Sequence, residues 1–245
     1  MSPSEKTKFI SNWIKLYVDQ MPIKAKSLVI GISGGIDSSV SSTLSAMTGI
    51  KTIVLTMPIR QKDNQHDLSL KHQEWLIKNF KNVEAHTINL DKLFESFSST
   101  LEKFDNEHGY ANSRARLRMT TLYQVAAANK GIVVGTGNKV EDFGVGFYTK
   151  YGDGGVDISP IADCNKTEVW ELGKELGILK EIIDAPPTDG LWDDGRTDEG
   201  QLGFKYKDLE DAMKNPNSPH RQEYEKIRKQ NLHKMEPIPV CKIPS

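Results

Sequence analysis

The stretch Val29–Val40 reads VIGISGGIDSSV, and its pattern decides the fold class of the chain. The apolar run Ser27–Ile30 predicts a buried strand, and a sequence with the character of a helix follows it. The glycines between them permit a turn with positive φ and let backbone N–H groups approach a ligand closely. Three hydroxyls and one carboxylate fall within Ser33–Ser39, where a new helix needs capping acceptors.

The loop between this strand and helix predicts a site for phosphate or pyrophosphate. The N–H groups and the dipole of a helix N-terminus favour a bound anion. An anion site that also contains a carboxylate, here Asp37, needs a cation, and Mg²⁺ is the cation that carboxylates and phosphates share. An ordinary glycine-rich turn remains the alternative interpretation.

Strand and helix patterns alternate outward from this loop. Strands are predicted at 27–32, 51–56, 83–90 and 131–135. Helices are predicted at 5–20, 37–48, 65–80, from the capping residue Asp91 onward, 111–130, 166–176, 206–214 and 218–232. The alternation predicts an α/β fold with an open, mostly parallel twisted sheet and helices on both faces. Ligands of such sheets bind at the carboxyl ends of the strands. If the first and fourth strands are neighbours, Gly31–Ser39 and Gly135–Asn138 face one crevice.

Composition restricts the classes of partner. The 245 residues suffice for one α/β domain over 1–245, and a net charge of -1 argues against a nucleic-acid partner held by bulk charge. There is no membrane-length apolar run and no signal-peptide pattern at the start, so a cytoplasmic protein is expected. Cys164 and Cys241 lie outside any CxxC pair and are expected to be reduced thiols. The Pro/Gly-rich segment 184–203 is predicted to be a lid.

The glycine loop does not match the commoner nucleotide motifs. No GxxxxGK[ST] occurs, and Gly135-Thr136-Gly137 is followed by Val140 where a dinucleotide fingerprint needs glycine. Ser33–Ser39 instead resembles the SGGxDSS pyrophosphatase loop of the N-type ATP pyrophosphatases. That family cleaves ATP between the α and β phosphates and adenylates an acceptor oxygen.

Further motifs resemble the NAD synthetase branch of this superfamily. They occur in family order and cover about residues 9–236: Asn112–Met119, Gly135–Glu141, Phe147–Asp157, Lys166–Val169, Pro187-Thr188, Thr197–Glu199 and Leu232–Lys234. The resemblance implies ATP- and Mg²⁺-dependent amidation of nicotinic acid adenine dinucleotide (deamido-NAD) by ammonia, with AMP and pyrophosphate as by-products. It also implies a ligase that catalyses the last step of NAD biosynthesis, and a homodimer.

The resemblance carries roles to individual positions. It implies a catalytic set of Asp37, Ser33 and Lys166. It implies metal ligation by Asp37 and by Glu141, with the adjacent Asp142 left as an alternative ligand. The implied ATP contacts are Gly31, Ile32, Ser33, Gly34, Gly35, Ile36, Asp37, Ser38, Thr136, Lys166 and Thr188. The implied deamido-NAD contacts are Arg116, Lys150, Asp157, His233 and Lys234.

Two points of function stay open at this level. Glutamine-using members of the family carry an N-terminal amidase domain; the loop domain here begins near residue 1, so free ammonia is expected unless a separate subunit supplies it. Rival interpretations are an ammonia-using ATP pyrophosphatase with a different carboxylate or carbonyl substrate, and a non-catalytic nucleotide sensor. Without the resemblance, Arg116 would be interpreted as a solvated helix charge and His233 as a surface histidine.

Overall fold

The protein is built on a parallel sheet whose strands are ordered β3-β2-β1-β4. The structure is a computed structural model that describes residues 1–60, 63–188 and 197–244. The strands are β1 (Ser27–Gly31), β2 (Lys51–Thr56), β3 (Val83–Thr87) and β4 (Gly131–Val133). Every strand pair among the described residues is parallel.

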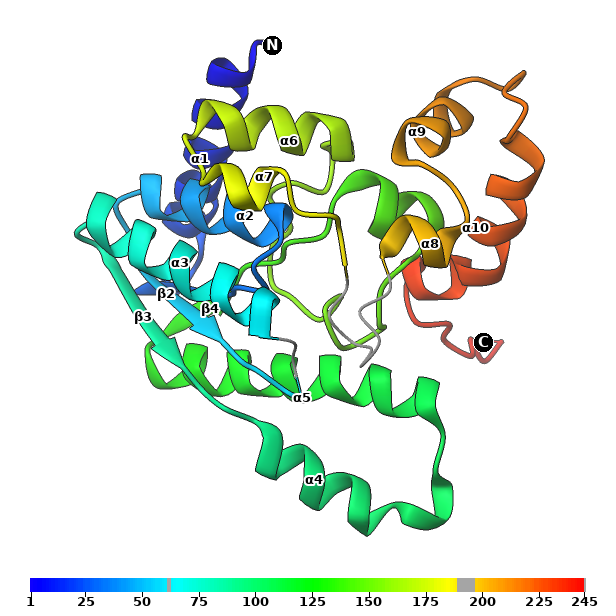
Figure 1. Cartoon of the computed structure of the whole chain (residues 1–245), viewed down its shortest axis with the longest axis horizontal. Coiled ribbons are helices and arrows are strands. Elements are labelled where there is room, and N and C mark those ends of the chain that lie inside the picture. Colours follow the sequence, from blue (N-terminus) through cyan, green and yellow to red (C-terminus); the bar gives the residue numbers. More distant parts are fainter. Residues whose placement is uncertain (61–62, 189–196, 245) are drawn as a thin grey trace.

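The helices follow the alternation that the sequence predicts (Figure 1). The α-helices are α1 (Pro3–Gln20), α2 (Ile36–Met47), α3 (Asp63–Asn79), α4 (Asp91–Thr100), α5 (Glu107–Ala128), α6 (Lys166–Glu175), α7 (Lys180–Ile183), α8 (Asp198–Leu202), α9 (Tyr206–Lys214) and α10 (Arg221–Met235). A 3₁₀ turn, η1, covers Glu102–Phe104, and a π-helix, η2, covers Lys139–Val145.

Both faces of the sheet are covered by helices, which confirms the predicted fold class. Side chains of β1 alternate between the faces, as the period of a strand requires. Leu28 and Ile30 pack into a buried cluster with α1, α2 and α6. Val29 packs on the opposite face, in a cluster with α4 and α5. All three side chains are fully buried, as expected for a central parallel strand.

The order of the strands places a switch point at β1. The chain steps from β1 to β2 and β3 on one side, and then returns to pair β4 with the other side of β1. The first and fourth strands are therefore neighbours, which is the condition for the two loops to face one crevice. The turn after β1 and the segment after β4 leave the sheet at the same edge, where ligands of doubly wound folds bind.

Some predicted boundaries differ from the structure. The third strand ends at Thr87 rather than residue 90, because its partner β2 ends at Thr56, just before Pro58. Asp91 does not cap the following helix: Leu90 is the N-cap, and the Asp91 carboxylate accepts the backbone N–H of Arg60 at 2.6 Å. The segment 184–203, predicted to be a lid, contains helix α8; its residues 189–196 lie outside the described part of the chain.

Candidate active site

The turn after β1 exposes the N-terminus of α2 without a side-chain cap. Gly34 has φ +87°, a conformation in which glycine carries no steric penalty. Gly35 is the N-cap of α2, and no side chain accepts the first N–H groups of the helix. The expectation that Ser or Asp caps this helix is therefore wrong. The uncapped N–H groups instead suit an external anion.

The serines of the loop hold its shape. The Ser38 hydroxyl accepts the backbone N–H of Ser33 at 3.2 Å and donates to the carbonyl of Gly35 at 3.0 Å. The Ser33 hydroxyl lies 3.1 Å from that of Ser38 and accepts the Gly35 N–H at 3.2 Å. These bonds close the loop on itself.

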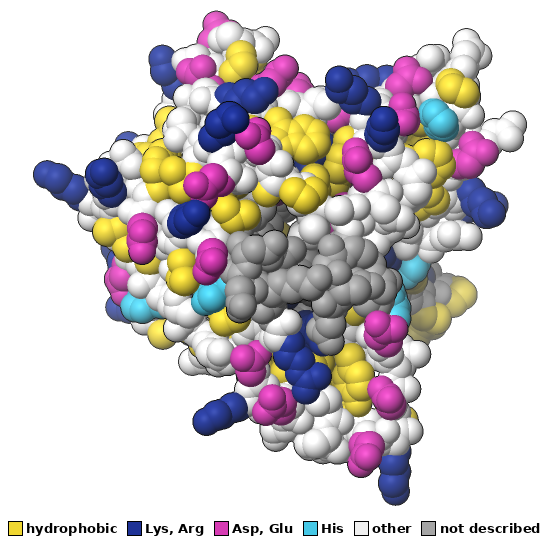
Figure 2. Space-filling model, viewed as in Figure 1, with side chains coloured by type: hydrophobic (Ala, Val, Ile, Leu, Met, Phe, Trp, Pro, Cys, Tyr) yellow, Lys and Arg dark blue, Asp and Glu magenta, His cyan; other side chains and the backbone are white. Residues whose placement is uncertain are grey.

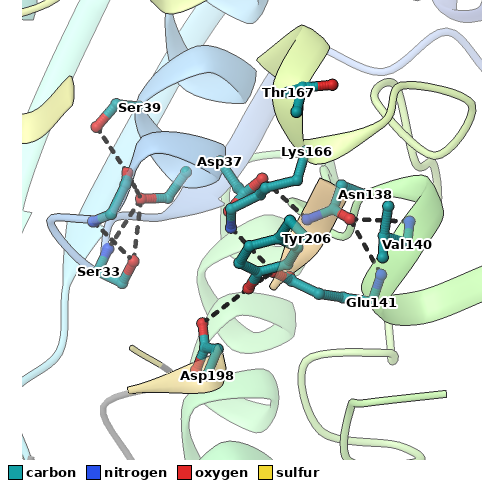
Figure 3. A network of polar contacts seen from close by, with 12 residues as sticks. Ser33, Asp37, Ser39, Asn138, Val140, Glu141, Lys166, Thr167, Asp198 and Tyr206 are labelled. Atoms are coloured by element: carbon teal, nitrogen blue, oxygen red, sulfur yellow. Dashed lines mark hydrogen bonds and ion pairs between the residues drawn. The ribbon is translucent and has the colours of Figure 1, made fainter. Parts of the chain in front are cut away.

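A buried lysine joins two carboxylates beside the loop (Figure 3). The Lys166 ammonium forms an ion pair with Asp37 on α2 and another, at 2.9 Å, with Glu141 on η2. The Lys166 side chain is 2% exposed, whereas those of Asp37 and Glu141 are 17% and 14% exposed. Three residues more than 20 positions apart in sequence thus converge on one point.

Asn138 links the Asp37 carboxylate to the start of η2. Its side-chain N–H donates to Asp37 at 3.1 Å, and its side-chain oxygen accepts the backbone N–H groups of Val140 and Glu141 at 3.0 Å. The residue is fully buried and is the N-cap of η2. No role was predicted for it, although an Asn three positions before a Glu is a recognisable helix-start signal.

The charges in this group stabilise one another. Burial lowers the pKa of Lys166, but Asp37 and Glu141 outweigh burial and raise the pKa well above its usual value. Burial raises the pKa of Asp37, and the Lys166 ammonium opposes that shift. For Glu141, burial is again opposed by Lys166 and by a hydrogen bond from Tyr206, and the net pKa is lowered. Lys166 and Glu141 therefore stay charged at neutral pH.

Tyr206 and Asp198 complete the network, and sequence reasoning assigned neither a role. The Tyr206 hydroxyl donates to Glu141 at 2.5 Å and lies 3.4 Å from the Asp198 carboxylate. Burial, followed by the charges of Glu141 and Asp198, raises the pKa of Tyr206 far above its usual value, so the hydroxyl remains a donor. Asp198 lies in the motif Thr197–Glu199, which contributed to the resemblance without a role for the residue. Tyr206 is 65 positions from its partner Glu141, so no local pattern in the sequence indicates the contact.

A cavity of about 390 Å³ opens beside this network. The predicted residues that line it are Gly31, Ile32, Ser33, Gly34, Gly35, Ile36, Asp37, Ser38, Thr136, Glu141, Lys166, Thr188 and the alternative metal ligand Asp142. Every position implied as an ATP contact thus reaches one cavity. Its size falls in the usual range for small-molecule sites.

The five predicted dinucleotide contacts do not line that cavity and make other contacts. Arg116 donates to the carbonyl of Lys150, and the Lys150 ammonium donates to the carbonyl of His233 at 2.9 Å. The Asp157 carboxylate accepts the backbone N–H of Val133 at 2.7 Å. The Lys234 ammonium donates to the carbonyls of Gly146 and Tyr148 at 2.7 and 2.9 Å.

These contacts tie α10 to the glycine-rich segment 146–157. Burial lowers the pKa of Lys234, and the nearby Asp153 and Asp142 oppose that shift. Arg116, Asp157 and His233 are exposed, so their side chains remain accessible on the surface next to the cavity. We refer to residues 146–157 together with α10 as the C-terminal strap.

The donor set beside the loop fits a Mg²⁺ ion that also binds phosphates. Mg²⁺ sites of this kind use one or two carboxylates and complete the coordination with phosphate oxygens and water. Asp37 and Glu141 supply two carboxylates that already face one cation, the Lys166 ammonium. Within the described ranges, no group of three or more His, Cys, Asp or Glu side chains is placed to hold a metal. Asp142 is not paired with Lys166, and its pKa is raised well above the usual value by burial and by Asp153.

On the face in Figure 2, basic and acidic side chains are interspersed rather than segregated. Among the helices that the structure describes, none combines the length and apolar character needed to span a bilayer.

Comparison with known proteins identifies the family. The sequence model of the NAD synthase family matches residues 6–243. An NH(3)-dependent NAD(+) synthetase of Carboxydothermus hydrogenoformans is 38% identical over 212 residues, which are 84% of this chain and 83% of that protein. The enzyme of the same name from Finegoldia magna is 36% identical over 227 residues, 92% of this chain and 90% of the relative.

Solved structures agree with the sequence relatives. An NMN synthetase from Francisella tularensis superposes with a TM-score of 0.91 at 32% identity, covering 99% of this chain and 100% of the other. An NH3-dependent NAD synthetase from Campylobacter jejuni has a TM-score of 0.79 at 23% identity, and this likeness concerns the fold alone. The chain belongs to the NAD synthase family.

Proposed function

We propose that residues 1–245 form one catalytic domain that amidates the pyridine carboxylate of nicotinic acid adenine dinucleotide with ammonia and ATP. The observation that carries the proposal is the joining of Asp37, Lys166 and Glu141 at an uncapped helix N-terminus inside a ligand-sized cavity. The membership of the NAD synthase family and the names of the sequence relatives support the choice of substrate.

The reaction needs two bond-making steps. A carboxylate oxygen attacks the α-phosphorus of ATP, the bond to the β-phosphate oxygen breaks, and pyrophosphate leaves. Ammonia then attacks the carbonyl carbon of the mixed anhydride through a tetrahedral oxyanion, which needs electrostatic stabilisation. AMP leaves with the former carboxylate oxygen, the nitrogen loses a proton, and the amide remains. Positioning and charge neutralisation supply most of the rate enhancement.

The residues of the cavity divide these tasks. The loop Gly31–Ser38 offers its N–H groups and the end of α2 to the departing pyrophosphate. Lys166 offers the buried positive charge that developing negative charge on phosphorus requires. Thr136 and Thr188 line the same cavity and complete the proposed ATP contacts. Mg²⁺, when bound, would neutralise phosphate charge, with Asp37 and Glu141 as its protein ligands.

The exposed part of the predicted substrate site suggests an assembly. Arg116, Asp157 and His233 lie on the surface outside the cavity, and the family resemblance implies a dinucleotide site near a subunit interface. We therefore propose a homodimer in which this surface is completed by a second copy. Light scattering at micromolar protein concentration measures the mass directly, and a monomer would contradict this part of the proposal.

A second substrate is favoured by one specific observation. The structure with a TM-score of 0.91 is described as an NMN synthetase, whereas the NAD synthetase structure from Campylobacter jejuni scores 0.79. The alternative is amidation of the mononucleotide acid by the same chemistry. The mononucleotide lacks the adenylate half, so surface contacts such as Arg116 would be irrelevant to it.

Parallel assays separate the two substrates. The protein is given ATP, Mg²⁺ and ammonium with either acid, and amide and AMP are measured together. We expect a higher kcat/KM with the dinucleotide, and a loss for Arg116→Ala that is confined to it. Preference for the mononucleotide, unaffected by Arg116→Ala, would select the second candidate; coupled turnover with neither acid would refute the family activity for this chain.

A further inference from the structure

Tyr206 lies at the junction of three elements of the site. It begins α9 and is 2% exposed. Its hydroxyl donates to Glu141 of η2 at 2.5 Å, and its ring centroid lies 5.0 Å from the Lys166 ammonium of α6. The same hydroxyl is 3.4 Å from Asp198, the first residue of α8 (Figure 3).

The hydroxyl and the lysine bind the same atom. Oε1 of Glu141 accepts both the Lys166 ammonium, at 2.9 Å, and the Tyr206 hydroxyl. Two donors from different directions restrict the rotation of a carboxylate more than one donor does. Residues that orient a ligating side chain in this way affect metal affinity without touching the metal.

We propose that Tyr206 is a positioning residue that orients Glu141 for Mg²⁺ and the phosphates of ATP. The inference rests on the proposed function, because it takes Glu141 as a metal ligand. It adds a residue that neither the loop motif nor the resemblance includes.

Contacts that do not involve the Tyr206 hydroxyl also anchor α9. Glu210 of α9 accepts the backbone N–H and the hydroxyl of Thr167 at 3.0 and 2.7 Å, which anchors α9 to the start of α6. The ring of Tyr206 packs edge-on against Trp170, with centroids 5.8 Å apart. Tyr206→Phe keeps the ring and these contacts, and it removes only the hydrogen bonds of the hydroxyl.

The test compares Tyr206→Phe with wild type in two Mg²⁺ titrations. The first measures AMP release at saturating ATP. The second measures Mg²⁺ binding by calorimetry to enzyme saturated with α,β-methylene ATP, which does not turn over. We expect the Mg²⁺ midpoint to rise about 10–100-fold in both titrations, while kcat at saturating Mg²⁺ stays close to the wild-type value.

Tyr224→Phe is the matched control. Tyr224 is 6% exposed in the same buried cluster as Tyr206, and its ring lies 5.6 Å from Arg221 rather than beside Lys166. We expect its Mg²⁺ midpoints to equal those of wild type.

Each remaining outcome has a definite meaning. An unchanged Mg²⁺ midpoint in Tyr206→Phe, or a fall in kcat that Mg²⁺ does not restore, would overturn the positioning role. Failure of Tyr206→Phe to fold would assign the hydroxyl to stability and overturn it as well. Absence of turnover in the wild type with either nucleotide acid would instead contradict the proposed function. The calorimetric titration needs no turnover, so it still tests the role of Tyr206 in that case.

Discussion

The phosphate loop and the C-terminal strap border the same site but are built differently. The loop half pairs buried charges: Lys166 is 2% exposed and lies between two carboxylates. The strap half is bound by cationic side chains that donate to backbone carbonyls, as Lys234 does to Gly146 and Tyr148. Charges that are buried and paired resist rearrangement, whereas half-exposed cations on carbonyls can exchange partners at low cost. We propose from this difference that the loop half carries fixed phosphate chemistry and that the strap provides adaptable substrate binding.

Lys166→Met should have the largest effect on stability. It leaves Asp37 and Glu141 buried beside each other without a cation, and breaking a buried pair in this way costs about 3–5 kcal/mol of unfolding free energy. Mg²⁺ should then raise Tm more in the variant than in wild type, because the metal replaces the missing charge.

The exposed pair Lys139–Asp163 supplies the control for that experiment. The two side chains are 39% and 96% exposed, so Lys139→Met should cost less than about 1 kcal/mol. Both variants are measured by thermal unfolding. Equal losses of stability in Lys166→Met and Lys139→Met would mean that the buried ion pairs of the loop half contribute no more than an exposed pair.

Asp37→Asn should lower the rate of AMP release by about 10²–10³-fold. The amide keeps the shape of the carboxylate but cannot supply its charge to a cation. Glu141→Gln should raise the Mg²⁺ concentration needed for half-maximal AMP release, because it also removes a proposed metal ligand. Asp142→Asn should leave that concentration close to the wild-type value. A Mg²⁺ shift in Asp142→Asn alone would transfer the ligand role to Asp142, and wild-type AMP release by Asp37→Asn would remove Asp37 from the mechanism.

His72 makes the stability of the loop half depend on pH. Its ring is fully buried against α2, 3.1 Å from the Ser42 hydroxyl, and burial lowers its pKa to about 4. Because the unfolded chain binds the proton at about pH 6.5, stability is complete above that pH and falls as the pH drops toward 4, by about 2 kcal/mol at pH 5. Denaturant unfolding measured between pH 5 and 7 should show that the free energy of unfolding depends less on pH in His72→Gln than in wild type. The same pH dependence in both proteins would contradict the burial argument.

Lys234→Met should have the smallest effect, confined to the strap. Losing two bonds to carbonyls should raise KM for the nucleotide acid about tenfold, or ~1.4 kcal/mol, with KM for ATP unchanged. Lys229→Met, at an exposed position of the same helix, is the control. Equal increases in both KM values for Lys234→Met would mean that the two halves do not act separately.

The features that could be predicted from the sequence are those formed by residues close together in the chain. The strand, the glycine turn and α2 are local, so one contiguous motif predicts them together with Asp37. The adjacency of β1 and β4 is set by the sheet topology, which the local patterns leave open. The starts of α2 and α4 were predicted to within one residue, but their capping side chains were wrong because nearby groups compete for them: Asp91 binds Arg60, and Ser38 binds Ser33 and Gly35.

Tyr206 could not be predicted, for a physical reason. Its partner Glu141 is 65 positions away, and the contact exists only because α9 docks on α6. No periodicity or local motif in the sequence indicates a hydrogen bond that forms only when distant helices pack together. Asn138 is the opposite case, because its capping pattern with Glu141 is visible in the sequence.

Transfer of oxygen from substrate to AMP tests the central claim most directly. The nucleotide acid is labelled with ¹⁸O in both carboxylate oxygens, turned over with ATP, Mg²⁺ and ammonium, and the AMP and pyrophosphate are analysed by mass spectrometry. Adenylation of the carboxylate predicts one ¹⁸O atom in each AMP and none in pyrophosphate. Label in pyrophosphate, or unlabelled AMP alongside labelled amide, would contradict it.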